Sequence, residues 1–143
     1  MSKAYYIGVE IGGTKQQLAV GLSDGTILDS RQVKLVYRRG AEDILDWLSD
    51  NIREYLAMAP YAGHIAGIGV GFGGPLETAT GRVLSSLQVP GWKNFQLKQW
   101  FETEFGLPVM VVNDTVTGGF AELYKGAGRN SENFFYTNIG TGI

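Results

Sequence analysis

The alternation of apolar and polar positions predicts three short strands at the start of the chain. Residues 5–11 (YYIGVEI) form an apolar run that stops at two glycines, as a short strand does. Residues 16–22 alternate apolar with polar side chains up to the turn sequence Ser-Asp-Gly, and residues 26–37 resume the alternation. Strands that follow one another through short turns predict an antiparallel meander.

Helical and strand-like patterns alternate after this meander. Residues 41–58 place apolar side chains at spacings of three and four, which predicts an amphipathic helix that ends before Pro60. The further elements predicted are a buried strand at 65–70, an irregular segment at 72–92 with a short hairpin near 82–87, a helix at 96–105 closed by Gly106, a second buried strand at 109–112, a helix at 114–124 that stops at Gly126, and a strand at 133–139.

This order of elements predicts an α/β fold with a mixed sheet. Three antiparallel strands are followed by right-handed parallel crossovers, which place helices on both faces of the sheet. The length of 143 residues suits a single domain. The last predicted strand has no element after it to pair with, so we expect it to begin a second domain.

Composition excludes several classes of protein. The 12 Lys and Arg residues against 14 Asp and Glu give a net charge of −2 with no dense basic stretch, so we expect no nucleic-acid partner. The absence of cysteine excludes disulfides, thiolate metal sites and a cysteine nucleophile. No apolar run reaches about 18 residues and no secretory signal is evident, so we expect no membrane partner and a cytoplasmic location.

Glycine, with 21 residues about twice its usual share, gathers at the ends of the predicted strands. Residues 8–15 (GVEIGGTK) have the glycine spacing of a P-loop, but the order of Lys and Thr is reversed and a strand follows. This loop is therefore either an ordinary hairpin turn or a nest of backbone amides that binds phosphate. Residues 69–74 (GVGFGG) match the letters of a dinucleotide fingerprint, but no helix follows directly, which disfavours nicotinamide binding.

The second buried strand ends at Asn113 and Asp114, where a helix is predicted to begin. For Asp114 alone, a helix N-cap is the simpler interpretation. The carboxyl end of a parallel strand is also where open α/β sheets bind ligands, and a carboxylate there can accept a proton from a hydroxyl that attacks a phosphate. Asn113 carries both a donor and an acceptor with which to orient such a substrate.

Six motifs occur in order along the whole chain: EIGGTK, GFGGP, VPGW, LPVMVVND, GAGR and IGTGI. The ordered set resembles the ROK family of sugar kinases and repressors, in the superfamily of actin and hexokinase. The resemblance implies a ribonuclease H-like (actin-like ATPase) domain at 1–130, with 131–143 as the first strand and phosphate loop of a second domain that is otherwise absent. It also implies ATP-dependent phosphorylation of a hexose or hexose-like sugar by the full-length protein, glucokinase-like or fructokinase-like, and an inactive fragment.

The resemblance assigns a role to each candidate site residue. Asp114 is implied as the catalytic base and Glu10 as a Mg²⁺ ligand, with ATP and Mg²⁺ as cofactors; zinc is possible only in a part beyond Ile143. The remaining roles are a first phosphate loop of Gly12, Gly13, Thr14 and Lys15, a second phosphate loop of Gly140, Thr141 and Gly142, and sugar binding by Gly74, Gln88, Asn113 and Asp114. The expected partners are a small sugar and ATP, and we expect the full-length protein to form a homodimer.

Three positions depart from the family pattern. Glu10 stands where Asp is usual, Gly73 where Pro is common, and Gln88 where an Asn that binds sugar is usual. These departures leave open a degenerate homologue that binds sugar without turnover. A sugar-responsive transcriptional regulator is the other alternative, although the first glycine loop begins too close to Met1 to leave room for a helix-turn-helix segment before it.

Overall fold

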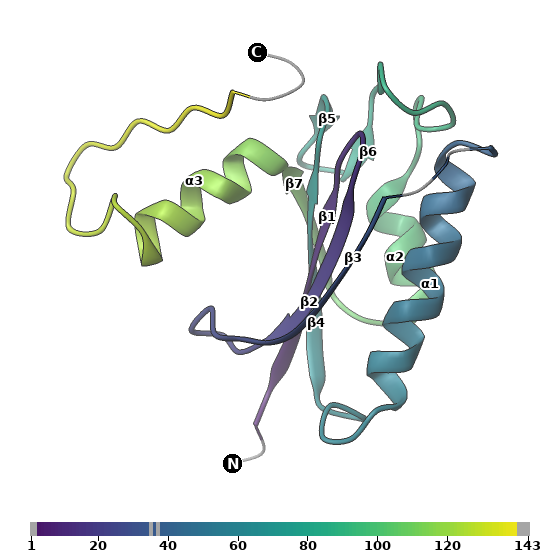
Figure 1. The fold of residues 1–143 in the computed structure, drawn as a ribbon, viewed down its shortest axis with the longest axis horizontal. Coiled ribbons are helices and arrows are strands. Elements are labelled where there is room, and N and C mark those ends of the chain that lie inside the picture. The colour runs from purple at the N-terminus through teal and green to yellow at the C-terminus, as the bar shows by residue number, and fades with distance from the viewer. Residues whose placement is uncertain (1–2, 35, 37, 140–143) are drawn as a thin grey trace.

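The computed structural model describes residues 3–34, 36 and 38–139, and its main feature is a mixed five-stranded sheet (Figure 1). The strands of this sheet lie in the order β3-β2-β1-β4-β7, and β5 and β6 form a separate small hairpin. The elements are β1 (Tyr5–Ile11), β2 (Gln16–Gly21), β3 (Ile27–Val33), α1 (Ala41–Ala57), β4 (Ile65–Phe72), β5 (Leu76–Glu77), β6 (Arg82–Val83), α2 (Leu97–Phe105), β7 (Val109–Asn113) and α3 (Asp114–Lys125).

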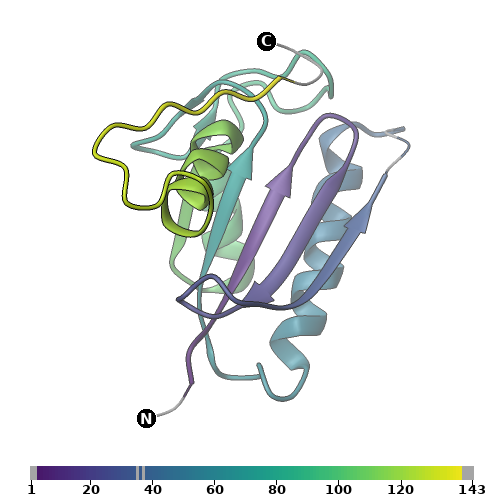
Figure 2. The same ribbon diagram turned by 60° about the vertical axis from the view of Figure 1, so that its left-hand side comes forward.

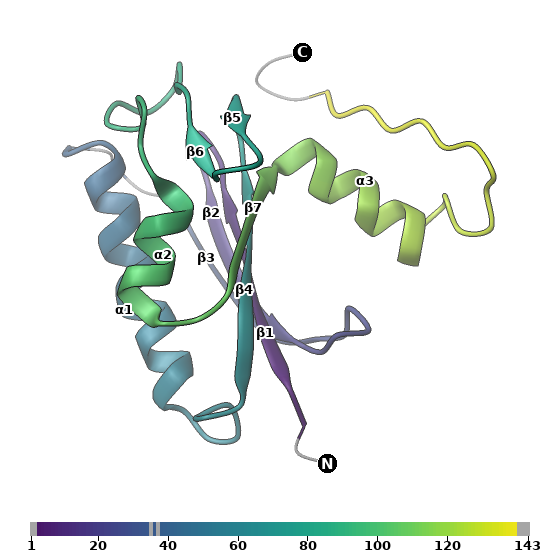
Figure 3. The ribbon, with the colours of Figure 1, turned by 180° about the vertical axis from the view of Figure 1, so that it is seen from behind.

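Helices cover both faces of the sheet, as the sequence predicts. α1 and α2 lie on one face and α3 lies on the other, which Figures 1 and 3 show from opposite sides. The buried stripe of α1 consists of Ala41, Ile44, Leu48, Ile52 and Tyr55, at the predicted helical spacing. In contrast, α3 has no buried residue, so the core lies mainly between the sheet and the α1–α2 layer.

The long loop between β6 and α2 is anchored in this core by Trp92. Its side chain is only 1% exposed and makes edge-to-face contacts with Phe72 and Phe95, each with ring centroids 5.3 Å apart. The Pro90 carbonyl accepts a 2.8 Å hydrogen bond from the Ala41 amide at the start of α1. These contacts fix the position of the loop relative to the sheet.

Most predicted elements are confirmed, with small shifts in their ends. The strand predicted at 26–37 is shorter, since β3 ends at Val33; Leu35 and Tyr37 lie outside the described residues. The short hairpin begins earlier than predicted, with β5 pairing with β6. Gly106 ends α2 with a φ of 65°, the left-handed conformation that favours glycine at this position.

The strand predicted at 133–139 does not form in the described structure, whereas its place at the start of a second domain stays a prediction. The segment lies beside α3, as Figure 2 shows. The alternation of side chains that predicted a strand instead places Phe134 and Tyr136 against α3, while Phe135 between them is 88% exposed. An apolar alternation predicts an extended chain, but a strand also requires a neighbour to pair with.

Tyr55 of α1 joins the helix to the edge of the sheet. Its hydroxyl donates a 2.9 Å hydrogen bond to Asp29 of β3, and the guanidinium of Arg31 lies 4.4 Å from the centre of its ring. Burial of the ring and the hydrogen bond to Asp29 raise the pKa of Tyr55 from 10.0 to about 12. The folded state therefore retains this proton at a pH where an unfolded tyrosine loses it.

Replacing Tyr55 with Phe tests this contact. We expect Tyr55→Phe to lower the free energy of unfolding of the full-length protein by about 1 kcal/mol at neutral pH, because one hydrogen bond is lost. A raised pKa contributes stability that is complete below pH 10 and is lost as the pH rises toward 12. Urea denaturation across this range should therefore show the two proteins converging, and an unchanged gap at high pH would contradict the assignment.

Candidate functional site

The register of three parallel strands brings the candidate site residues together. β1 pairs in parallel with β4, and β4 pairs in parallel with β7. In this register Ile11 lies opposite Phe72, and Phe72 lies opposite Asn113. The residues that follow these three, Gly12, Gly73 and Asp114, therefore leave the sheet side by side at one edge.

A polar hollow of about 330 Å³ lies at this edge. Its charged side chains are Glu10, Lys15 and Asp114. The complete lining is Glu10, Gly12, Gly13, Thr14, Lys15, Gly73, Gln88, Asp114, Thr115 and Asn138. The structure thus brings together most of the residues for which the sequence predicts a role in binding.

The first glycine loop is a turn between the antiparallel strands β1 and β2, and its shape depends on Gln16. The side chain of Gln16 is fully buried; its amide nitrogen donates to the Gly12 carbonyl at 2.9 Å, and its oxygen accepts from the Gly12 amide at 3.2 Å. This role was not predicted from the sequence, because Gln16 was identified only as the first residue of a strand. A polar residue directly after a glycine loop is the signal that could have identified it.

Asn113, rather than Asp114, is the N-cap of α3, which corrects the simpler interpretation of Asp114. The Asn113 side-chain oxygen accepts from the Thr115 amide at 2.9 Å. Its amide nitrogen donates to the Gly74 carbonyl at 3.1 Å and thereby holds the loop after β4. Neither Gly74 nor Asn113 is among the residues that line the polar hollow, and both are half-buried beside it.

Asp114 points its carboxylate toward the hollow. One oxygen, Oδ1, accepts from the Thr115 amide at 2.8 Å, while Oδ2 lies close to Gly73, 3.1 Å from where a Cβ on that glycine would stand. Gly73 also donates its amide to the Ile11 carbonyl at 2.8 Å, a bond that the proline common at this family position cannot make. The departure at Gly73 therefore ties the ends of β1 and β4 together beside the carboxylate.

Glu10 and Asp114 are the two carboxylates that face the hollow. Glu10 is exposed at the end of β1 and accepts a 2.5 Å hydrogen bond from the Gln17 side chain. Within the described part of the chain there is no cluster of three or more acidic, His or Cys side chains that could hold a metal alone. Two carboxylates nevertheless fit Mg²⁺, which proteins usually bind through one or two carboxylates together with substrate phosphates.

The second phosphate loop predicted at Gly140, Thr141 and Gly142 lies outside the described residues. The chain that leads to it does reach the site, because Asn138 lines the polar hollow. Gln88, predicted to bind sugar, lies in the hollow directly against Gly13 of the first loop.

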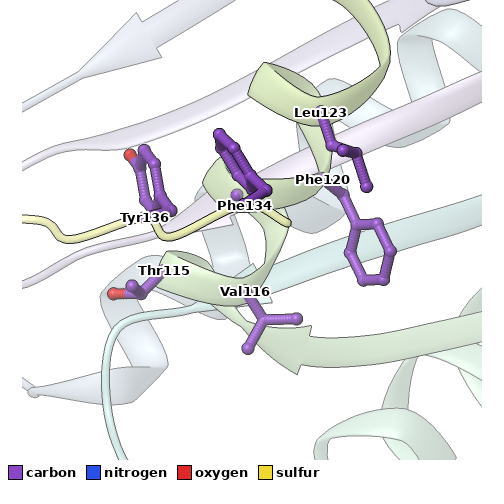
Figure 4. Close-up of a pocket in the computed structure, with 7 residues that line it drawn as sticks. Thr115, Val116, Phe120, Leu123, Phe134 and Tyr136 are labelled. Carbon is purple, nitrogen blue, oxygen red and sulfur yellow. The ribbon is translucent and has the colours of Figure 1, made fainter. Parts of the chain in front are cut away.

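A second hollow, of about 290 Å³, is apolar and lies between α3 and the segment that follows it (Figure 4). Figure 4 shows Phe134 and Tyr136 lying along the helix beside Val116, Phe120 and Leu123. No charged side chain lines this hollow. Of the two hollows, only the polar one is lined by charged side chains.

Comparison with known proteins identifies the family. The family model described as "ROK family" matches residues 6–143. The chain belongs to the ROK family. A glucokinase of Halalkalibacterium halodurans is 32% identical to it over 149 aligned positions, which cover all of this chain and 43% of the glucokinase. The chain thus spans less than half the length of this relative.

Solved structures of ROK proteins share the fold. A ROK family glucokinase from Streptomyces griseus, in complex with glucose and AMPPNP, matches with a TM-score of 0.72 and 31% identity over 89% of this chain and 38% of its own. A ROK family transcriptional regulator, a homologue of the E. coli MLC protein, matches with a TM-score of 0.71 and 24% identity over 86% of this chain and 31% of its own. These matches confirm the predicted actin-like ATPase fold. No helix in the described residues is long and apolar enough to cross a membrane.

Substitutions at Asn113 test its contribution as the cap of α3 in this ROK domain. Asn113→Ser retains an oxygen that can cap α3 but loses the donor to Gly74, whereas Asn113→Ala loses both. We expect the alanine variant to be less stable than the serine variant by about 1 kcal/mol in thermal or urea denaturation, the usual contribution of an N-cap. Equal stability of the two variants would show that the cap contributes nothing.

Proposed function

We propose that the full-length protein is an ATP-dependent sugar kinase in which Asp114 is the catalytic base. The observation that carries the proposal is the position of the Asp114 carboxylate directly after β7, where it lines the same polar hollow as the glycine loop that follows β1. The glucokinase relative and the glucokinase structure with glucose and AMPPNP support a sugar kinase. The substrate is proposed to be a hexose or a similar sugar.

The chemistry follows from the groups that face the hollow. Asp114 accepts the proton of a sugar hydroxyl as the hydroxyl oxygen forms a bond to the γ-phosphorus of ATP. The bond from that phosphorus to the bridging oxygen breaks, and ADP leaves with the electron pair. Backbone amides of the first glycine loop, the Thr14 hydroxyl and Lys15 orient the phosphates and balance their charge. Bound Mg²⁺, held by Glu10, would supply further neutralisation of the phosphate charge.

A binding protein without turnover is the second candidate. The departures from the family pattern at Glu10, Gly73 and Gln88 favour it, since Glu10 is one methylene longer than the usual Asp and shifts any metal that it binds. The ROK transcriptional regulator with the same fold is compatible with this candidate at the level of fold alone. Tight sugar binding without turnover on any hexose would favour it over the kinase.

Replacing Asp114 with Asn separates catalysis from binding. The amide keeps the size of the carboxylate but cannot take up a proton, so we expect kcat of the full-length protein to fall by about two to four orders of magnitude. Sugar affinity, measured by isothermal titration, should remain within a few-fold of the wild type. A coupled assay of ADP formation gives the rate.

The matched control is Asp50→Asn, which makes the same chemical change at an exposed position of α1. This control should retain full turnover. Near-normal turnover of Asp114→Asn would show that Asp114 is not the catalytic base.

A further inference from the structure

We infer that Gln88 acts on the phosphate side of the site, where its side-chain amide contacts the terminal phosphate of the bound nucleotide. This inference rests on the proposed kinase function and revises the expectation, drawn from the sequence, that Gln88 binds the sugar. It identifies a residue that determines nucleotide affinity rather than sugar specificity.

The backbone that carries Gln88 is held on both sides. The Ser86 hydroxyl accepts hydrogen bonds from the Gln88 and Val89 amides, at 3.3 and 3.2 Å. The Val89 side chain is 2% exposed, and Trp92 anchors the following turn in the core. The buried neighbours therefore fix the backbone at Gln88 and so orient its side chain, which is itself exposed.

That direction leads to the first glycine loop. If Gly13 carried a Cβ, this atom would lie 1.2 Å from Oε1 and 2.3 Å from Cδ of Gln88. The end of the Gln88 side chain thus occupies the space that any other residue at position 13 would fill. Gly13 does not adopt a positive φ, so the absence of a side chain at this position, rather than its backbone conformation, lets Gln88 lie against the loop.

The chemistry of the side chain suits a phosphate. Its amide can donate through Nε2, and the side chain has no hydrogen-bond partner among the described residues. An Asn at this position would end one bond earlier, at about the level of the Gln88 Cδ, and would withdraw its amide from above Gly13. The additional methylene of Gln88 therefore moves the amide toward the loop that is proposed to bind phosphate.

The test measures nucleotide and sugar affinity separately in the full-length protein. The variants are Gln88→Ala, which removes the amide, and Gln88→Glu, which keeps the shape but replaces the donor with a negative charge. AMPPNP with Mg²⁺ is the nucleotide probe in isothermal titration, and the best hexose substrate of the wild type is the sugar probe. Gln99→Glu, on the exposed side of α2, is the control for the change in net charge.

We expect Gln88→Ala to raise the Kd for AMPPNP about tenfold, the effect of one hydrogen bond to a charged group. Gln88→Glu should raise it further, since a carboxylate repels the phosphates. The Kd for the hexose should stay within about twofold of the wild type in both variants, and Gln99→Glu should alter neither affinity.

Three results would overturn the inference: a weaker hexose affinity with unchanged AMPPNP affinity, no change in either, or an equal loss of both. The first of these would restore Gln88 to the sugar side and leave the kinase proposal intact. Failure of the wild type itself to bind AMPPNP would instead overturn the kinase proposal, and this inference with it.

Discussion

The site depends on the parallel register of β1, β4 and β7. Hydrogen bonding between these strands aligns their carboxyl ends, so that Gly12, Gly73 and Asp114 emerge at one edge of the sheet. Each comes from a different third of the chain, and no local interaction would bring them together. A slip of one residue in either pairing would turn the following side chain to the other face and separate the carboxylate from the glycine loop.

Close packing of loops at this edge then shapes the pocket. Gln16 holds the first loop through hydrogen bonds to Gly12, and Asn113 holds the loop after β4 through a hydrogen bond to Gly74. Trp92 packs in the core and fixes the loop that carries Gln88. All three contacts use groups that are at least partly buried, which keeps the exposed groups of the hollow available for a ligand. The structure thus separates two sets of residues that the sequence does not distinguish, namely those that hold the loops in place and those that face the hollow.

The order and type of elements could be predicted from the sequence because they depend on local periodicity. The buried stripe of α1, the two short parallel strands and the glycine that ends α2 all follow from spacing and turn chemistry. Periodicity alone could not show whether residues 133–139 form a strand, since a strand also needs a neighbouring strand with which to pair. The contacts of Asn113 with Gly74 and of Gln88 with Gly13 were hidden for the same reason, because each joins residues that are distant in sequence.

The central claim is that the hollow between the first glycine loop and Asp114 binds both substrates of a kinase. A crystal structure of the full-length protein with AMPPNP, Mg²⁺ and its best hexose substrate tests this claim most directly. We expect the terminal phosphate above the Gly12–Thr14 turn, with a sugar hydroxyl within hydrogen-bond distance of the Asp114 carboxylate. Ligands bound elsewhere, with this hollow filled only by water, would contradict the account.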